Sequence, residues 1–181
     1  MVSRRYREPV SAAPDVRVRP ALPADVSAIR SLVEPYAEQR ILLPKEWVGY
    51  YESVQEFVVA EDADTGAVVG CGALHVMWSD LAEVRTLAVA PSHRGQRVGH
   101  ALLTALMDRA RALGLRRLFC LTFEVDFFVA HGFHAIDGTP VTPDVYLELL
   151  RSHDDGVAEF LDLARVKPNT LGNTRMLIDL A

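Results

Sequence analysis

Two cysteines are all that the 181-residue sequence contains, and neither belongs to a CxxC pair or to a cysteine–histidine ligand spacing. This scarcity argues against a structural zinc site, and we expect no metal at the functional site. Cys71 and Cys120 each lie in an apolar run, where a free cysteine usually serves as a small buried hydrophobe. The pattern is typical of a reducing compartment.

Positive charge and long apolar runs are also scarce. Nineteen lysines and arginines face 24 aspartates and glutamates, a net charge of −5, which argues against nucleic acid as a partner. No stretch approaches the roughly 20 apolar residues of a membrane span. The N-terminal arginines are followed by no apolar segment of the kind that secretory signals carry. We therefore expect a cytoplasmic protein with no membrane partner.

Length and patterning predict one globular domain. Residues 1–14 mix arginine, proline, serine and alanine without periodicity, so we expect a flexible leader followed by a single domain over 15–181. Periodicity predicts a helix opening at 23–25, a loop over 41–47 and helices over 98–113, 126–131, 145–151 and 157–163. Strands are predicted over 16–19, 57–60, 67–77, 82–89, 117–122 and 175–180. Antiparallel strands followed by a strand–helix–strand crossover predict an α+β fold with a mixed sheet.

The most informative segment joins the strand at 82–89 to the long helix. Free backbone N–H groups at such a helix start, together with the helix dipole, form a cradle for a pyrophosphate. Gly95 and Gly99 allow close approach of the backbone, and Arg94 and Arg97 add charge. Dinucleotide-binding and P-loop folds use a similar turn, but neither GxGxxG nor GKS/GKT is present. From spacing alone, a solvated basic turn explains the segment equally well.

The stretch VRTLAVAPSHRGQRVGHALLTALMDRARALGLRRLFCLT resembles the acetyl-CoA motif of the GNAT acetyltransferases, and FFVAHGF resembles their C-terminal signature. The resemblance implies acetyl-CoA as co-substrate and a mixed, mostly antiparallel sheet, splayed at the acetyl-CoA site, with helices on both faces. Arg97 stands where the family's Arg/Gln-x-x-Gly-x-Gly/Ala pattern has its first glycine, and we expect its amide to serve all the same. The implied cofactor contacts are Leu87, Ala88, Val89, Arg94, Gly95, Gln96, Arg97, Val98, Gly99, His100 and Ala101.

A narrower resemblance covers nearly the whole chain after the leader. EQRILLPKEW, CGALHVMWSDLAEVRTLAV and VKPNTLGNTRMLIDL are similar to the acetyltransferase domain of N-acetylglutamate synthases, notably the short actinobacterial forms without a kinase domain. The resemblance implies acetylation of the α-amine of glutamate or glutamine, the first step of arginine biosynthesis. It also makes a small amino acid the expected partner.

Glu83 is the expected general base, acting directly or through a water. Glu83 and Arg85 lie two apart on a strand and share a face, which we expect Leu87 and Val89 to continue. The pKa of Glu83 would have to rise from about 4.3 for efficient catalysis at neutral pH. A surface strand that simply carries a glutamate and an arginine is the alternative reading of this pair.

Phe128 stands where many GNAT enzymes have a tyrosine that protonates the CoA thiolate. The resemblance implies Thr122 as a hydrogen-bond donor in its place. Expected substrate-binding residues are Lys45, Arg85, Lys167, Asn173, Thr174 and Arg175. The four cations in this set favour a small acidic acceptor over a peptide.

Two other functions remain open at this stage. One is acetylation of another small amine or of a protein N-terminus, and the other is a CoA-binding sensor without activity, which the missing tyrosine and Arg97 would fit. Fold analogy suggests a homodimer.

Overall fold

The computed structural model describes residues 15–166 and 172–180, so the predicted leader lies outside the described residues. Within them, seven strands form one sheet in the order β1-β2-β3-β4-β5-β7-β6. The strands are β1 (Val16–Pro20), β2 (Phe57–Asp62), β3 (Val68–Trp78), β4 (Leu81–Val89), β5 (Arg117–Thr122), β6 (His134–Ala135) and β7 (Thr174–Asp179). The predicted α+β class with a mixed sheet is confirmed, because β4 and β5 pair parallel while the other neighbours pair antiparallel.

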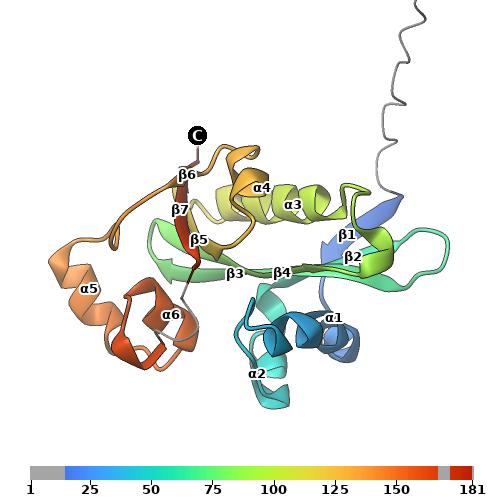
Figure 1. Cartoon of the computed structure of the whole chain (residues 1–181), viewed down its shortest axis with the longest axis horizontal. Helices are drawn as coiled ribbons and strands as arrows, with labels where there is room; N and C mark the ends of the chain where they lie inside the picture. The colour runs from blue at the N-terminus through green and yellow to red at the C-terminus, as the bar shows by residue number, and fades with distance from the viewer. Residues whose placement is uncertain (1–14, 167–171, 181) are drawn as a thin grey trace, which may run out of the picture.

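Helices cover both faces of this sheet (Figure 1). They are α1 (Val26–Glu38), α2 (Trp47–Glu52), α3 (Val98–Ala112), α4 (Val125–Val129), α5 (Pro143–Leu149) and α6 (Asp155–Phe160). The helices α3 and α4 lie on one face and α1 and α2 on the other, while α5 and α6 lie on the α1 side near β7. No helix among the described residues is long and apolar enough to cross a membrane.

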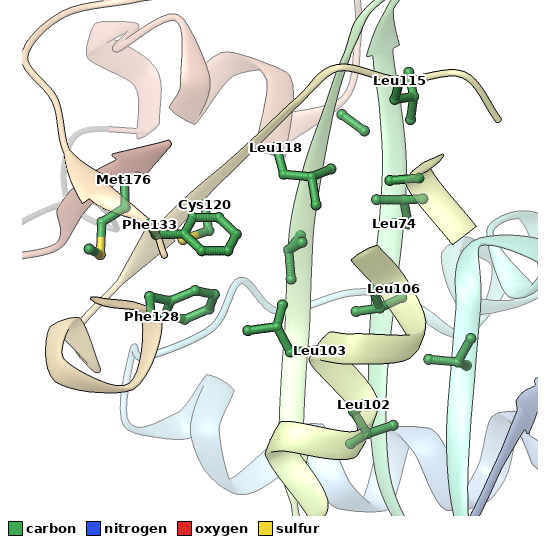
Figure 2. Packing of buried hydrophobic residues seen from close by; sticks show 14 of the residues in the cluster. Leu74, Leu102, Leu103, Leu106, Leu115, Leu118, Cys120, Phe128, Phe133 and Met176 are labelled. Carbon is green, nitrogen blue, oxygen red and sulfur yellow. The ribbon is translucent and has the colours of Figure 1, made fainter. Parts of the chain in front are cut away.

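The long helix α3 makes the crossover between β4 and β5. Its apolar residues recur at helical spacing, so they bury one face against the sheet. Leu102, Leu103 and Leu106 are fully buried there, beside Phe128 and Phe133 (Figure 2). Each such leucine contributes roughly 1.5–3 kcal/mol of burial free energy, so this contact fixes the start of α3 relative to β4.

The sheet is splayed between its two central strands. Pairing of β4 with β5 covers only Leu81 to Glu83, opposite Arg117 to Phe119. Beyond Glu83, residues 84–89 of β4 still pair with β3 but have no partner on the β5 side. The predicted opening of the sheet is therefore present, and it leaves unpaired backbone groups along one edge of β4.

A β-bulge sits in this unpaired part of β4. Arg85 lies opposite Ala73, and Ala88 lies opposite Cys71. From the first pair to the second, β4 moves on by three residues while β3 moves by two, so β4 contains one extra residue. Thr86 takes a left-handed conformation with φ of 58°, which is strained for a β-branched residue.

The bulge corrects one expectation from the sequence. Leu87 and Val89 pack with Val84 in the core beneath α3, whereas Ala88 joins the core beneath α1. Without the bulge, strict alternation would have kept Leu87 and Val89 on the face of Glu83 and Arg85. The extra residue reverses the faces, so the prediction that these four share one face was wrong.

Candidate active site

Two pockets meet at the bulge of β4. The polar pocket, about 440 Å³, lies beside Glu83, Arg85 and Thr86. The loop pocket, about 640 Å³, lies beside Leu87 and the segment that leads into α3. Ile41 lines both pockets, so they adjoin at the splay.

The loop pocket contains the start of α3. Gly95 has φ of 76°, a conformation that glycine adopts without steric cost. Arg97 is the N-cap residue, with φ of 64°, and no side-chain hydrogen bond caps the helix. The amides of Val98, Gly99 and His100 in the first turn therefore have no intrahelical acceptor. Arg97 takes the left-handed conformation that the usual glycine would take, so the loop keeps its shape.

Side chains hold this loop against the rest of the fold. Gln96 Nε2 donates to the carbonyl of Ser92 at 2.9 Å. Arg94 donates to the Tyr36 hydroxyl at 2.8 Å, and that hydroxyl donates to the carbonyl of Val89 at 3.0 Å. Gln96 therefore stabilises the loop without lining the loop pocket, whereas Arg94 is one of the lining residues.

The loop pocket fits the pyrophosphate of CoA. Uncapped amides at the positive end of a helix dipole attract an anion, and Arg94 and Arg97 add two full charges. Six predicted contacts besides these arginines line the pocket: Leu87, Val89, Gly95, Val98, Gly99 and His100. Two other predicted contacts do not line the pocket. Ala88 packs in the core beneath α1. Ala101 lies one turn into α3, and its amide already donates to the carbonyl of Arg97.

The polar pocket is built around a buried ion-pair cluster. Arg85 Nε donates to Glu83 Oε2 at 3.0 Å, and Arg85 Nη1 donates to both oxygens of Asp154 at 3.0 and 3.1 Å. Glu83 is 4% exposed. Burial raises the pKa of Glu83, and the charge of Arg85 opposes this shift. A buried carboxylate with a raised pKa is the state that a general base requires.

Arg85 keeps one donor group unused. Its Nη2 lies 2.9 Å from Glu83 Oε2, within ion-pair distance, yet makes no hydrogen bond within the described residues. Gly156 of α6 packs directly on the guanidinium, since a Cβ at this position would lie 2.9 Å from Arg85 Cζ. The guanidinium of Arg85 is therefore enclosed between Glu83, Asp154 and Gly156, and its Nη2 is buried.

Lys45 is one of the residues that line the polar pocket. Its Nζ donates to Ser53 Oγ at 3.0 Å and lies 5.8 Å from the centroid of the Phe57 ring. Burial lowers the pKa of Lys45, and the nearby charge of Arg85 lowers it further. A ligand carboxylate would offset both effects.

The charges that line the polar pocket differ from the expected cationic set. Only Lys45 and Arg85 contribute lysine or arginine side chains to the described lining. The acidic residues of the lining are Glu46, Glu52, Glu83, Asp154, Asp155 and Glu159. The pocket therefore carries more acidic than basic side chains.

Glu159 of α6 is a second buried carboxyl of this pocket. It is 8% exposed and makes no side-chain hydrogen bond within the described residues. Burial raises its pKa to about 7, and the negative charge of Glu83 adds to the shift. Two carboxyl groups with raised pKa values thus face one cavity.

The remaining predicted residues occupy different places. Asn173 lines the polar pocket, whereas Lys167 lies outside the described residues. Thr122 and Thr174 pair with each other across β5 and β7 and line neither pocket. Arg175 also lines neither pocket.

Arg175 is engaged with the protein itself. Its guanidinium donates to the backbone carbonyls of Gly138, Glu159 and Phe160. It also lies 4.9 Å from the centroid of the Phe119 ring. These contacts hold α6 against the sheet, so we leave Arg175 out of the proposed substrate site.

Asp154 and Glu159 were missed in the sequence. Asp154 carries one local signal, because it is an N-cap residue whose side chain accepts the amide of Val157. Its ion pair with Arg85 joins residues that are 69 positions apart in the sequence. A local sequence pattern cannot predict such a contact.

Comparison with known proteins agrees with this geometry. Residues 26–137 match the Acetyltransferase (GNAT) family. An "Amino-acid acetyltransferase" of Mycobacterium tuberculosis is 58% identical over 164 residues, which are 90% of this chain and 94% of that protein. The crystal structure of Rv2747 from M. tuberculosis, in complex with CoA and NLQ, superposes with a TM-score of 0.89 at 58% identity and covers 91% of this chain and 99% of that one.

A longer enzyme is also similar. The N-acetylglutamate synthase of Neisseria gonorrhoeae, complexed with coenzyme A and N-acetyl-glutamate, has a TM-score of 0.72 at 25% identity. The match covers 92% of this chain and 35% of that one.

A phosphate-binding loop beside a splayed sheet and a buried carboxylate defines a CoA-dependent acyltransferase. The chain belongs to the GNAT family of acetyltransferases, and acetyl-CoA is its co-substrate.

Replacing Arg97 separates its conformation from its charge. Arg97→Gly and Arg97→Ala both remove the guanidinium, but only glycine adopts φ near 64° without steric cost. We expect the glycine variant to be more stable than the alanine variant by about 1 kcal/mol. Denaturant unfolding of both variants measures this difference. Equal stability would contradict a left-handed residue at the N-cap of α3.

Stability should depend on pH through Glu159. A carboxyl whose pKa rises to about 7 on folding favours the folded state below its unfolded pKa. That contribution is lost as pH rises through 7, and it amounts to about 3 kcal/mol. We expect Glu159→Gln to flatten the fall in unfolding free energy between pH 5 and pH 8. Glu148→Gln, on the surface of α5, is the control and should leave the fall unchanged.

Proposed function

We propose that this protein transfers the acetyl group of acetyl-CoA to the α-amine of L-glutamate or L-glutamine, which is the first step of arginine biosynthesis. The observation that carries the proposal is the meeting of two pockets at the splay of β4. One pocket offers uncapped helix amides and two arginines for a phosphate, and the other offers a buried carboxylate beside a guanidinium and Lys45. The relatives named for amino-acid acetylation support an amino acid as the acceptor.

Positioning of the two reactants supplies the main catalytic effect. The unpaired edge of β4, residues 84–89, offers backbone groups to the pantetheine arm in the manner of an added strand. The thioester then lies near Leu87, next to the polar pocket. A backbone N–H of residues 87–89 would donate to the oxyanion that forms at the acetyl carbonyl. Holding amine and thioester in attack geometry replaces a bimolecular encounter.

Glu83 is the proposed general base. The amino acid arrives as an ammonium ion, which must lose a proton before its nitrogen can form the C–N bond. Glu83 takes this proton directly or through a water, since burial raises its pKa and makes it a stronger base than an exposed carboxylate. Attack leaves an excess proton on the nitrogen of the tetrahedral intermediate. As the C–S bond breaks, the nitrogen loses this proton and the leaving thiolate takes one up, which gives the N-acetyl amino acid and CoA thiol.

Thr122 stays the predicted hydrogen-bond donor to the thiolate. Its Oγ1 accepts the amide of Glu124 at 2.9 Å, so the hydroxyl hydrogen is left to donate.

The charged residues of the polar pocket favour one of the two proposed acceptors, glutamine and glutamate. Lys45 and Arg85 are the lysine and arginine side chains of the described lining, and they are the groups proposed for the α-carboxylate of the substrate. The other charged groups of the described lining are acidic, and they would repel a second carboxylate. This favours glutamine, whose side-chain amide is neutral, over glutamate. A homodimer and a cytoplasmic location remain part of the proposal.

Release of CoA thiol from acetyl-CoA, measured with each amino acid separately, tests the function. We expect turnover with glutamine or glutamate and little with the other amino acids. Turnover with none of them, while acetyl-CoA still binds, would overturn the acceptor and leave a peptide acceptor or a sensor. A protein that fails to bind acetyl-CoA would contradict the whole proposal.

Glu83→Gln tests the base. The amide keeps the shape of the side chain but cannot accept a proton, so we expect kcat to fall by about 10²–10⁴-fold. Binding of acetyl-CoA, measured by calorimetry, should change little because Glu83 lies in the other pocket. Glu148→Gln is the matched control on the surface of α5. Full activity of Glu83→Gln across the pH range would refute the assignment.

A further inference from the structure

Two histidines in the loop pocket are hydrogen-bonded to each other. Nδ1 of His100, in the first turn of α3, lies 2.7 Å from Nε2 of His131, which follows α4. Their ring centroids are 4.7 Å apart, and the His131 ring also packs against Phe127. Both side chains line the pocket beside the uncapped helix start. The function proposed above uses only the backbone here and leaves these side chains without a role.

The hydrogen bonds determine where the protons of the neutral pair lie. His131 Nδ1 is 2.7 Å from the carbonyl oxygen of Phe127, and a carbonyl can only accept, so this nitrogen carries a hydrogen. His131 Nε2 is then the acceptor, and His100 Nδ1 donates to it. A neutral His100 therefore has no hydrogen on Nε2, which has no hydrogen-bond partner within the described residues.

One added proton changes what the pair presents to the pocket. If the proton enters on His100, its Nε2 becomes an N–H donor. If the charge resides on His131 instead, His131 Nε2 donates to His100 Nδ1, and His100 again carries its hydrogen on Nε2. Either arrangement replaces the lone pair on His100 Nε2 by an N–H donor and gives the pair one positive charge, which is the change that an anionic oxygen requires.

The surroundings of His100 oppose its protonation in the free protein. Burial lowers the pKa of His100, and His131 and Arg97 lower it further. The other charged or titratable groups that line the pocket are Tyr36, His93, Arg94 and Glu124, and the Tyr36 hydroxyl is bonded to Val89 and Arg94. His93 is already engaged, with Nε2 3.2 Å from Asp62 Oδ2 and Nδ1 2.9 Å from Ser92 Oγ. His100 Nε2 is thus the open titrating nitrogen of the pocket's described lining.

We propose that His100 and His131 form a proton-dependent phosphate subsite, which takes up a proton when a phosphate group of CoA binds. The subsite rests on the proposed function, because that function places CoA in the loop pocket. A phosphate stabilises the cation, so binding and protonation strengthen each other. The affinity for CoA should therefore rise as pH falls through neutrality. The phosphate is either part of the pyrophosphate or the 3′-phosphate.

Titration calorimetry of the full chain with CoA tests the subsite. Enthalpies measured at pH 7 in buffers of different ionisation enthalpy give the number of protons taken up on binding. We expect wild type to take up more protons than His100→Gln, by a substantial fraction of one proton. The variant should bind CoA roughly tenfold more weakly at pH 6, the loss of one charge-assisted hydrogen bond. The two should bind equally at pH 9.

Matched variants and ligands locate the effect. His131→Gln should reduce the proton uptake as well, whereas His93→Gln should retain it because both nitrogens of His93 already have partners. Dephospho-CoA lacks the 3′-phosphate, so retained uptake assigns the subsite to the pyrophosphate and lost uptake to the 3′-phosphate. Pantetheine, which has no phosphate, should bind without proton uptake.

Equal proton uptake by wild type and His100→Gln, with CoA bound by both, would overturn the subsite and leave the proposed function intact. Failure of wild type to bind either CoA or pantetheine would overturn the proposed function itself. The two failures are therefore distinguishable in one set of titrations.

Discussion

The extra residue in β4 is the constraint on which the arrangement of the site depends. Before Thr86, the side chains of Glu83 and Arg85 face the polar pocket; after it, Leu87 faces the loop pocket under α3. One strand thereby presents its side chains to both reactants on opposite sides of the sheet. The left-handed Thr86 costs on the order of 1–3 kcal/mol. The burial of α3 against the sheet offsets that cost many times over.

The polar pocket shows how a few buried charges set the chemistry. A single guanidinium, Arg85, serves two carboxylates, Glu83 and Asp154. Burial raises the pKa of Glu83, and it raises that of Glu159 to about 7, so each binds a proton more readily than an exposed carboxylate. The same short helix, α6, supplies Glu159 and the glycine that packs on Arg85. The geometry of the polar pocket therefore depends on how firmly α6 is held.

The loop pocket has the opposite electrostatic character. The chain as a whole carries a charge of −5, yet Arg94, Arg97 and the start of α3 concentrate positive potential at one place. Such local focusing draws an anionic ligand to its site despite the net charge. His100 adds a charge that depends on the ligand. The pocket thus combines permanent charges, which attract the cofactor, with one titrating pair that responds to it.

The amino-acid sequence by itself determined the order of the elements, because periodicity and turn residues are local properties. It also singled out the loop that we propose for the cofactor and the pair Glu83–Arg85, since each is a contiguous motif. Only the tertiary structure decided that Leu87 turns away from Glu83, because a bulge depends on pairing between strands. It likewise brought Asp154 to Arg85 and His131 to His100, contacts that join residues 69 and 31 positions apart. The charge of each pocket and the pKa values of its residues depend on such long-range contacts, which a local sequence pattern cannot predict.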